Sequence, residues 1–214
     1  MEENATLFVE EMHWGEQPVR LTALRCRVLP DDAPTTSVHI VAFFGEKVLV
    51  VRDRRGMFGF PGGRLEHGED VHQALNREVY EEARAYLKSE YDLFAVMKIE
   101  YTVRLPNRNY AHDFTYMGLY AGLVRGLDPI GADPAGVVTG RDLFSRPVCE
   151  YRLPRHDRVL LKEAVLALNR KPGFFYKGLK SFENFGMTAS GNLASEASSL
   201  QEDPQTPEES ADPT

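Results

Sequence analysis

A double glycine followed by a dense run of acidic residues constrains this chain more than any other feature of its sequence. The stretch GGRLEHGEDVHQALNREVYEEARAY, residues 62–86, contains six acids: Glu66, Glu69, Asp70, Glu78, Glu81 and Glu82. Residues 69–86 have the periodicity of a helix, because at about 100° per residue the apolar side chains share one arc. These side chains are Val71, Leu75, Val79, Ala83 and Tyr86. We expect that arc to face a hydrophobic core.

Two of the carboxylates fall on or beside the apolar arc. Glu82 lies inside it and Glu78 at its edge, while Glu81 lies one step further out. A carboxylate beside a core is costly unless something compensates it, and like charges four residues apart on a helix repel. A divalent cation would offset both costs, and oxygen ligands suit magnesium or manganese. The alternative is a solvated acidic face with ion pairs to Arg77 and Arg84.

The spacing of this stretch resembles the sequence box of the Nudix hydrolases. Gly63 is followed by five residues, Glu69, seven residues and the run Arg77-Glu78-Val79-Tyr80-Glu81-Glu82, and FGFPGG precedes the box. The resemblance extends over roughly 37–170. It implies an α/β fold, the Nudix α/β/α sandwich with a mixed curved sheet and a strand–loop–helix. One position departs from the box, because Arg84 stands where the family has a glycine. We expect this change to alter how the helix ends rather than to affect metal binding.

The resemblance also implies roles for individual residues. Metal ligands would be the side chains of Glu78, Glu81 and Glu82 together with the backbone carbonyl of Gly62. Gly63, Glu69 and Arg77 would support the loop and helix. The general base varies within the family; Glu81 and Glu78 are the nearest candidates, and outside candidates are Glu100, His112 and Asp113.

Substrate contacts are predicted from residue type and position. Arg52, Arg54 and Arg55 precede the glycine loop, and guanidinium groups bind phosphate oxygens in bidentate fashion. Aromatic faces stack on nucleobases, and the later strands offer Tyr101, Tyr110, Phe114 and Tyr116, of which we select Tyr101 and Tyr116. The alternatives are a solvated basic turn for the arginines and core packing for any single aromatic residue.

The activity implied by the resemblance is hydrolysis of a phosphoric anhydride bond. We expect a pyrophosphohydrolase that uses Mg²⁺, or Mn²⁺ in its place, to cleave a nucleoside di- or triphosphate, or a nucleoside diphosphate linked to another moiety. Water would attack phosphorus, and the metal would stabilise charge on the phosphoryl oxygens. Two alternatives stay open: a dinucleoside polyphosphate hydrolase, and a non-catalytic Nudix module that senses nucleotides.

The rest of the chain predicts the order of its elements. Residues 19–30, 37–44, 47–53, 93–105 and 114–124 favour strands, with Gly45-Glu46 as the turn of a hairpin, and 156–171 has helical periodicity. We therefore expect an N-terminal extension over 1–36 and the Nudix domain over 37–171. A C-terminal extension packing on the domain would follow over 172–188, then a disordered acidic tail over 189–214.

Composition excludes several classes of protein. Nearly all of the formal charge of −7 lies after residue 186, where six acids occur without any Lys or Arg, so stable binding to nucleic acid is not expected. Cys26 and Cys149 are too few and too far apart for a disulfide framework or a zinc site. Neither a signal peptide nor a transmembrane span is expected. We predict a cytoplasmic protein with a small nucleotide substrate; the terminal extensions leave a homodimer open.

Overall fold

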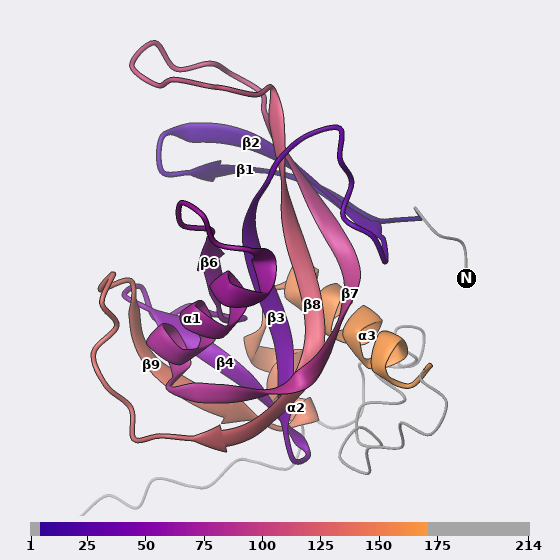
Figure 1. Ribbon diagram of the computed structural model, residues 1–214, viewed down its shortest axis with the longest axis vertical. Coiled ribbons are helices and arrows are strands. Elements are labelled where there is room, and N and C mark those ends of the chain that lie inside the picture. The colour runs from indigo at the N-terminus through magenta and orange to yellow at the C-terminus, as the bar shows by residue number, and fades with distance from the viewer. Residues whose placement is uncertain (1–4, 171–214) are drawn as a thin grey trace, which may run out of the picture.

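The computed structural model describes residues 5–170, which form one nine-stranded sheet flanked by helices (Figure 1). The order along the sheet is β1-β2-β7-β8-β3-β4-β5, with β6 paired to β3 and β9 paired to β4. The strands are β1 (Thr6–Trp14), β2 (Gln17–Arg25), β3 (Thr35–Phe44), β4 (Lys47–Asp53), β5 (Phe58–Gly59), β6 (Gly62–Arg64), β7 (Ala85–Tyr101), β8 (Phe114–Leu127) and β9 (Val138–Phe144). The helices are α1 (Val71–Ala83), α2 (Arg146–Arg152) and α3 (Arg155–Leu168).

The sheet is mixed. β3 and β8 run parallel, and the other paired strands are antiparallel. The predicted hairpin is confirmed, since Phe44 pairs with Lys47 across the turn. Central strands that are covered on both faces read as continuous apolar runs rather than alternating ones. This explains the apolar runs within 37–44 and 47–53.

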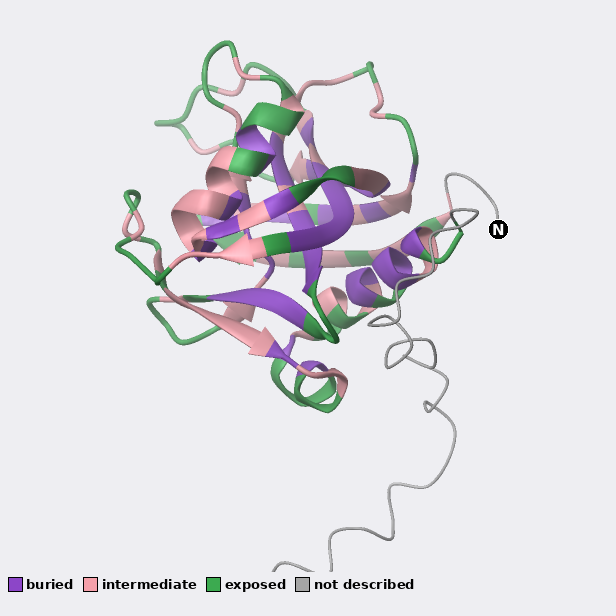
Figure 2. Cartoon of the chain, turned by 60° about the horizontal axis from the view of Figure 1, so that its bottom comes forward, coloured by how far each residue is buried: buried purple, intermediate pink, exposed green. Residues whose placement is uncertain are grey.

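Alternate side chains of the central strands enter two different cores. On β3, Val41 and Phe43 join the core on one face, whereas Ile40 and Ala42 join the core on the other. Figure 2 shows buried residues concentrated in the central strands and on the helix surfaces turned toward them. Side chains of successive strand residues point to opposite faces, so one short segment contributes to both cores.

Helices α1 and α3 cover opposite faces of the sheet. The core under α1 contains Ala74, Leu75, Val79 and Ala83 of that helix. The core under α3 contains Leu160, Leu161, Ala164, Val165 and Leu168. The arrangement is therefore the predicted α/β/α sandwich with a mixed sheet, and α1 with the preceding β6 forms its strand–loop–helix.

Several boundaries differ from the sequence-based expectation. The first helix ends at Ala83 rather than at residue 86, and Tyr86 belongs to β7 instead of the apolar arc of the helix. The segment 1–36 holds a hairpin of β1 and β2 that pairs with β7. Strand β9 and helix α2 were not predicted. The expected segments 172–188 and 189–214 lie outside the described residues. Among residues 5–170, none of the helices combines the length and the apolar character that crossing a membrane requires.

Candidate functional site

The double glycine brings the backbone of β6 against the carboxylates of α1. A Cβ atom on Gly63 would lie 2.4 Å from the carboxyl carbon of Glu78, so a side chain there would displace that carboxylate. At Gly62 a Cβ would lie 2.2 Å from the carbonyl oxygen of Val38, and its φ of 148° favours glycine. The Gly62 amide donates a 2.9 Å hydrogen bond to Oε2 of Glu82. Glycine at 63 therefore allows β6 to approach α1, and glycine at 62 allows β6 to approach β3.

Arg77 ties the glycine loop to the helix. Its Nε and Nη2 donate to the two carboxylate oxygens of Glu69 at 2.7 and 2.9 Å, and Nη2 also donates to the carbonyl of Arg64 at 2.9 Å. Its Nη1 lies 2.9 Å from Oε1 of Glu78 and 3.3 Å from Oε2 of Glu81. The hydrogen bonds from Arg77 lower the pKa of Glu69 to about 2. One guanidinium thus organises three carboxylates from the loop and the helix.

The start of α1 is fixed by a capping box. Oδ1 of Asp70 accepts hydrogen bonds from the amides of His72 and Gln73, each at 2.8 Å, and the Gln73 side chain accepts the Asp70 amide at 2.9 Å. This reciprocal pair satisfies amide groups that the first turn leaves without helical partners. The cap sets the register of the helix and hence the direction of its glutamates.

The ionised forms of Glu82 and Glu78 are energetically unfavourable in this position. Burial raises the pKa of Glu82 to about 7; the Gly62 amide opposes the shift, while Glu78, Asp133 and Glu81 add to it. Burial is also the main reason why the pKa of Glu78 is raised, with Arg77 opposing it. The expectation that carboxylates beside the core are destabilised is therefore met at both positions.

The donor set fits a hard divalent cation. Carboxylate oxygens are the ligands that magnesium and manganese prefer, and a cation would offset the burial of Glu82 and Glu78. Within residues 5–170, no three acidic, histidine or cysteine side chains are already arranged as a complete ligand set. Nη1 of Arg77 instead lies between Glu78 and Glu81, so cation binding requires a local rearrangement of these side chains.

The C-terminal end of α1 is held by a loop that sequence reasoning did not connect to it. Arg84 adopts the left-handed conformation, with φ 45° and ψ 44°, and its Nη2 donates to the carbonyl of Ala132 at 2.9 Å. Nη1 of Arg141 donates to the carbonyl of Ala83 at 2.7 Å and to that of Asp128 at 3.1 Å. The 128–137 loop is thereby fastened beside the glutamates, where the charge of Asp133 acts on Glu82.

Of the three arginines predicted to bind phosphate, Arg52 and Arg54 lie toward β9 and the 128–137 loop. Nη2 of Arg52 would be 3.1 Å from a Cβ on Gly140, and Nη2 of Arg54 would be 2.7 Å from one on Gly136. The amide of Arg55 donates to Oδ1 of Asp53 at 2.8 Å within the turn. Arg54 therefore borders the same loop as Asp133, Arg52 borders β9, and none of the three arginines lines the aromatic pocket described next.

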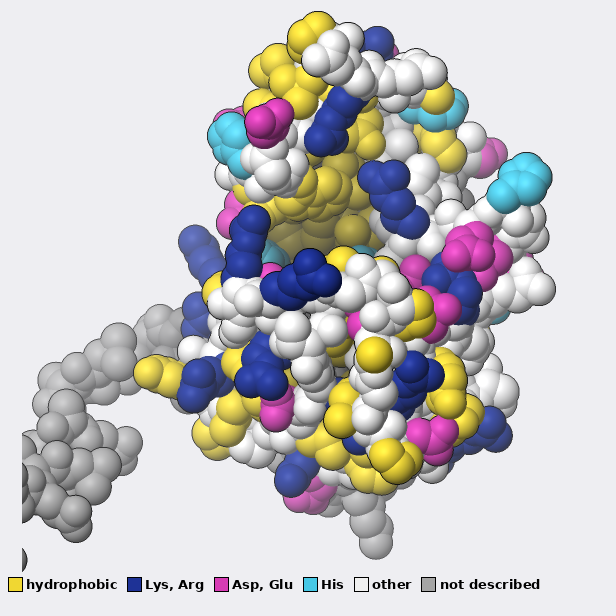
Figure 3. All heavy atoms as spheres, turned by 90° about the vertical axis from the view of Figure 1, so that its left-hand side faces the viewer, with side chains coloured by type: hydrophobic (Ala, Val, Ile, Leu, Met, Phe, Trp, Pro, Cys, Tyr) yellow, Lys and Arg dark blue, Asp and Glu magenta, His cyan; other side chains and the backbone are white. Residues whose placement is uncertain are grey.

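An aromatic and basic pocket of about 340 Å³ lies on the other side of the glycine loop. It is lined by Trp14, Gln17, Arg64, Tyr101, Arg108, Asn109 and Tyr110. Figure 3 shows this side of the molecule hollowed, with hydrophobic side chains on the floor and Lys and Arg side chains around it. Arg64 directly follows Gly63, and its carbonyl accepts from Arg77, so this pocket adjoins the carboxylates.

A buried glutamine builds the pocket wall. Gln17 is 1% exposed, and its Nε2 donates to the carbonyl of Val103 at 2.8 Å. Its Oε1 accepts a hydrogen bond from the Tyr110 hydroxyl, and the Tyr101 and Tyr110 rings lie 5.0 Å apart. The N-terminal hairpin is thus fastened to the 102–113 loop. Sequence reasoning selected Tyr101 but missed Trp14, Arg64 and Arg108, whose only signal was their residue type.

The remaining predicted residues lie elsewhere. Tyr116 is 5% exposed and packs in a small core with Cys26 and Val96. Glu100 pairs with Lys98 at 2.9 Å. His112 and Asp113 line a separate hollow together with Asp32, Arg104 and Phe114, and Asp113 pairs with Arg104. The structure therefore brings together Glu78, Glu81, Glu82, Gly62, Gly63, Glu69 and Arg77, and it separates Tyr116 from the pocket.

A comparison with known protein families and structures identifies one family that this chain matches. The sequence model of the NUDIX domain matches residues 33–139, half of the chain. No curated protein matches significantly. Among solved structures, the pyrophosphohydrolase BsRppH of Bacillus subtilis is 19% identical, with 83% of this chain and 98% of that chain covered and a TM-score of 0.47. A NUDIX hydrolase from Nitrosomonas europaea is 21% identical, with coverages of 77% and 89% and a TM-score of 0.45. A MutT NUDIX hydrolase from Burkholderia pseudomallei is 18% identical, with coverages of 62% and 98% and a TM-score of 0.46.

Proposed function

Since the chain belongs to the Nudix family, we propose that it is a divalent-metal-dependent pyrophosphohydrolase of nucleotides. Its substrate is a nucleoside di- or triphosphate, or a nucleoside diphosphate linked to another moiety, and water attacks phosphorus. Mg²⁺ is the expected cofactor, and Mn²⁺ should replace it. The observation that carries the proposal is the approach of Gly63 to Glu78 and of Gly62 to Glu82, with Arg77 linking Glu78 to Glu81 and burial raising the pKa of Glu82.

Each residue of the cluster has a separate task in this proposal. Glu82 and Glu78 hold the cation, and the Gly62 amide fixes the orientation of Glu82. When bound, the cation neutralises phosphate charge and lowers the pKa of water. Glu81 has the more exposed carboxylate, with 32% of its side chain accessible against 14% for Glu78. It is therefore better placed to accept the proton of the attacking water, with Arg77 holding its direction.

The aromatic pocket supports a nucleotide as the substrate. Trp14 and Tyr101 present aromatic faces that can stack on a base. Arg64 and Arg108 can bind phosphate oxygens between that base and the carboxylates. Because Arg64 adjoins Gly63, a base in the pocket would hold its phosphates near Glu78. The pocket therefore selects for compounds that carry both a base and a phosphate chain.

The first experiment is a substrate panel with the purified full-length protein. It includes nucleoside di- and triphosphates, nucleotide sugars, ADP-ribose and dinucleoside polyphosphates, with Mg²⁺ or Mn²⁺ and with chelator. We expect metal-dependent release of phosphate-containing products from one class. Cleavage confined to dinucleoside polyphosphates would select that alternative. Binding of metal and nucleotide without turnover of any substrate would reject catalysis and favour a sensing module.

Variants of Trp14 test the pocket separately. Trp14→Ala should raise KM for the preferred nucleotide by about tenfold with little change in kcat, because stacking on one base contributes about 1–3 kcal/mol. Trp14→Phe keeps an aromatic face and should recover most of the loss. Tyr151→Ala is the control, since Tyr151 is an 84% exposed aromatic residue on α2. An unchanged KM in Trp14→Ala would remove the pocket from the substrate path.

A further inference from the structure

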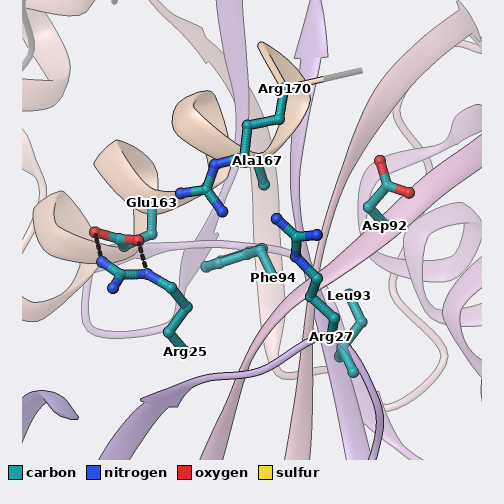
Figure 4. A pocket seen from close by; sticks show the side chains of 8 residues that line it. All are labelled: Arg25, Arg27, Asp92, Leu93, Phe94, Glu163, Ala167 and Arg170. Atoms are coloured by element: carbon teal, nitrogen blue, oxygen red, sulfur yellow. Dashed lines mark hydrogen bonds and ion pairs between the residues drawn. The ribbon is translucent and has the colours of Figure 1, made fainter. Parts of the chain in front are cut away.

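Two carboxylates on helix α3 have different surroundings. Glu163 receives two hydrogen bonds from Arg25, both at 2.9 Å, and Figure 4 shows this pair at the wall of a cavity between β2, β7 and α3. Asp157, in the first turn of the same helix, is also largely buried, but within residues 5–170 no hydrogen bond reaches its carboxylate. The ring of His156 lies beside it, with Nε2 3.8 Å from Oδ1, which is beyond hydrogen-bond range. Asp157 is therefore a buried acceptor whose capacity for hydrogen bonds is unused.

The neighbours of Asp157 do not compensate its burial. Burial is the main reason why the pKa of Asp157 is raised to about 6; His156 opposes the shift and Glu10 adds to it. The His156 ring is itself engaged by Glu10, whose Oε2 lies 2.9 Å from Nδ1 of the ring. Buried polar groups nearly always have hydrogen-bond partners, and one without a partner calls for an explanation. A ligand that donates N–H groups to Asp157 would supply the missing hydrogen bonds.

Asp157 faces the chain segment that leads into the glycine loop. Its Oδ2 would lie 4.0 Å from a Cβ atom on Gly59, which is ordinary van der Waals contact. Gly59 ends β5, and Gly62 of the double glycine follows three residues later. Three residues of extended chain span at most about 10 Å. The carboxylate therefore lies near one border of the proposed substrate site.

Strand β1 connects the start of α3 to the aromatic pocket. Alternate residues of a strand share one face, and Glu10 and Met12 are partly buried, whereas the residue between them is exposed. Trp14 continues the same face, because the pairing of β1 with β2 is regular over this stretch. Glu10 lies beside His156 at the start of α3, and Trp14 lines the aromatic pocket. At about 3.4 Å per residue, one strand face of about 14 Å therefore borders both places.

We propose that Asp157 determines the base specificity of the hydrolase by accepting hydrogen bonds from N–H groups on the edge of the base. The inference rests on the proposed function, because it takes the ligand to be a nucleotide. An ionised carboxylate only accepts hydrogen bonds, and guanine alone among the common bases offers two adjacent donors, its N1–H and its 2-amino group. Adenine and cytosine place an acceptor nitrogen beside the amino group, and uracil places a carbonyl on each side of its N–H. The expected substrate is therefore a guanine nucleotide.

Nucleoside 5′-monophosphates test the recognition without hydrolysis, because they contain no anhydride bond. The measurement is titration calorimetry of the full-length protein at pH 8, above the pKa of Asp157, so that its carboxylate is ionised. The ligands are the guanosine, inosine and xanthosine monophosphates; inosine lacks the 2-amino group, and xanthosine has a carbonyl in its place. We expect the guanosine compound to bind about tenfold more tightly than the inosine compound, because one of two hydrogen bonds is lost. The xanthosine compound should bind most weakly, and kcat/KM for the three triphosphates should follow the same order.

Asp157→Asn should reverse the preference between guanosine and xanthosine. Asparagine keeps the shape of the side chain but presents one donor and one acceptor, which match the carbonyl and the N1–H of xanthosine. The ratio of the two dissociation constants should change by about 100-fold, because one compound gains a matched edge and the other loses it. A purely structural role of Asp157 would not exchange the two preferences. Asp31→Asn makes the same substitution at an exposed position and should leave the order unchanged.

The outcomes separate this inference from the proposed function. Turnover without a preference for guanosine, or a preference that survives Asp157→Asn, would overturn the role of Asp157 and leave the hydrolase intact. The expected order in binding, without turnover of any triphosphate, would support base recognition and reject catalysis. If the natural chain neither binds any of the three monophosphates nor cleaves their triphosphates, both proposals are wrong.

Discussion

Helices α1 and α3 cover opposite faces of one sheet and both hold carboxylates against a core, but they satisfy these carboxylates differently. On α1, the single Nη1 of Arg77 is shared by Glu78 and Glu81. On α3, Glu163 receives two hydrogen bonds from Arg25. The acids therefore outnumber the cation in the cluster on α1, whereas Glu163 on α3 is matched by one cation.

This difference separates a structural carboxylate from a functional one. A carboxylate at the edge of a core indicates a cation site only where the surrounding cations fail to balance it. Glu82, whose pKa burial raises to about 7, lies in such a surplus. Glu163, which is buried, does not, because Arg25 balances its charge. Substituting Gln for each glutamate should therefore give opposite results in activity and stability.

The largest effect is expected for Glu82→Gln. Glutamine can still accept the Gly62 amide but carries no charge for a cation, so kcat/KM should fall on the order of 10²–10³-fold. The free energy of unfolding should stay within about 1 kcal/mol of that of the natural chain, because the lost charge is one that burial disfavours. Steady-state kinetics and urea denaturation measure the two effects. Normal turnover in a folded Glu82→Gln would remove α1 from the chemistry.

The matched substitution on α3, Glu163→Gln, should do the reverse. It leaves the guanidinium of Arg25 without its carboxylate, and breaking a buried pair costs about 3 kcal/mol. Turnover per folded molecule should be unchanged. Because a buried pair often contributes little relative to apolar residues, the double change Arg25→Met/Glu163→Met should recover most of the stability. A stable Glu163→Gln would show that the pair is not needed to hold α3 on the sheet.

Asp157, in the first turn of α3, extends the comparison of the two helices to the pH dependence of the free energy of unfolding. Burial raises its pKa to about 6, Glu10 adds to the shift and His156 opposes it. The folded state therefore binds the proton of Asp157 more tightly than the unfolded state does. The contribution of Asp157 to the free energy of unfolding is complete below about pH 4 and is lost as the pH rises through about 6. At pH 7 to 8, Asp157→Asn should raise the unfolding free energy by about 2 kcal/mol.

The pH profile itself is the control for that substitution. The gain in Asp157→Asn should disappear near pH 4, where the aspartate is already protonated, and the exposed Asp31→Asn should show no comparable change. Chemical denaturation at several pH values measures this. A gain that is the same at pH 4 and pH 8 would mean that packing, rather than charge, limits stability at Asp157.

The parts of the site that local geometry determines could be predicted from the sequence. The positions of Glu78 and Glu82 relative to the apolar arc follow from helix periodicity alone, and the hairpin of β3 and β4 follows from two apolar runs and a short turn. These features involve residues within a few turns of each other, so the sequence states them directly. The roles of Gly62 and Gly63, by contrast, were predicted from the resemblance to the Nudix box and not from local geometry.

The pocket walls could not be predicted, because they depend on contacts between distant segments. Gln17 bonds to the carbonyl of Val103, 86 residues later, and this contact brings Trp14 beside Tyr101. Tyr116 was selected by type, yet β8 turns it into a core. Helix α1 was extended to Tyr86 because apolar spacing continues past Ala83, while the helix ends through the backbone conformation of Arg84, which spacing does not encode.

The end of α1 offers the smallest expected effect and a direct test of that backbone conformation. Arg84 stands where the family box has glycine, and it is the non-glycine residue with positive φ among residues 5–170. Its side chain compensates, because the guanidinium lies 5.0 Å from the centre of the Tyr80 ring and donates to the carbonyl of Ala132. Arginine at this position therefore has a strained left-handed backbone, and its side chain compensates by binding the 128–137 loop.

Comparing Arg84→Gly with Arg84→Ala isolates the backbone contribution, since both substitutions remove the tether. In a helix interior alanine is more stable than glycine, but a left-handed residue after the last turn reverses this order. We expect Arg84→Gly to be more stable than Arg84→Ala by about 1 kcal/mol in urea denaturation. If alanine is equal to or better than glycine, the helix end must have relaxed out of the left-handed region. Both variants lose the hydrogen bond to Ala132 equally while Arg141 still holds Asp128, so any change in KM should be the same in the two.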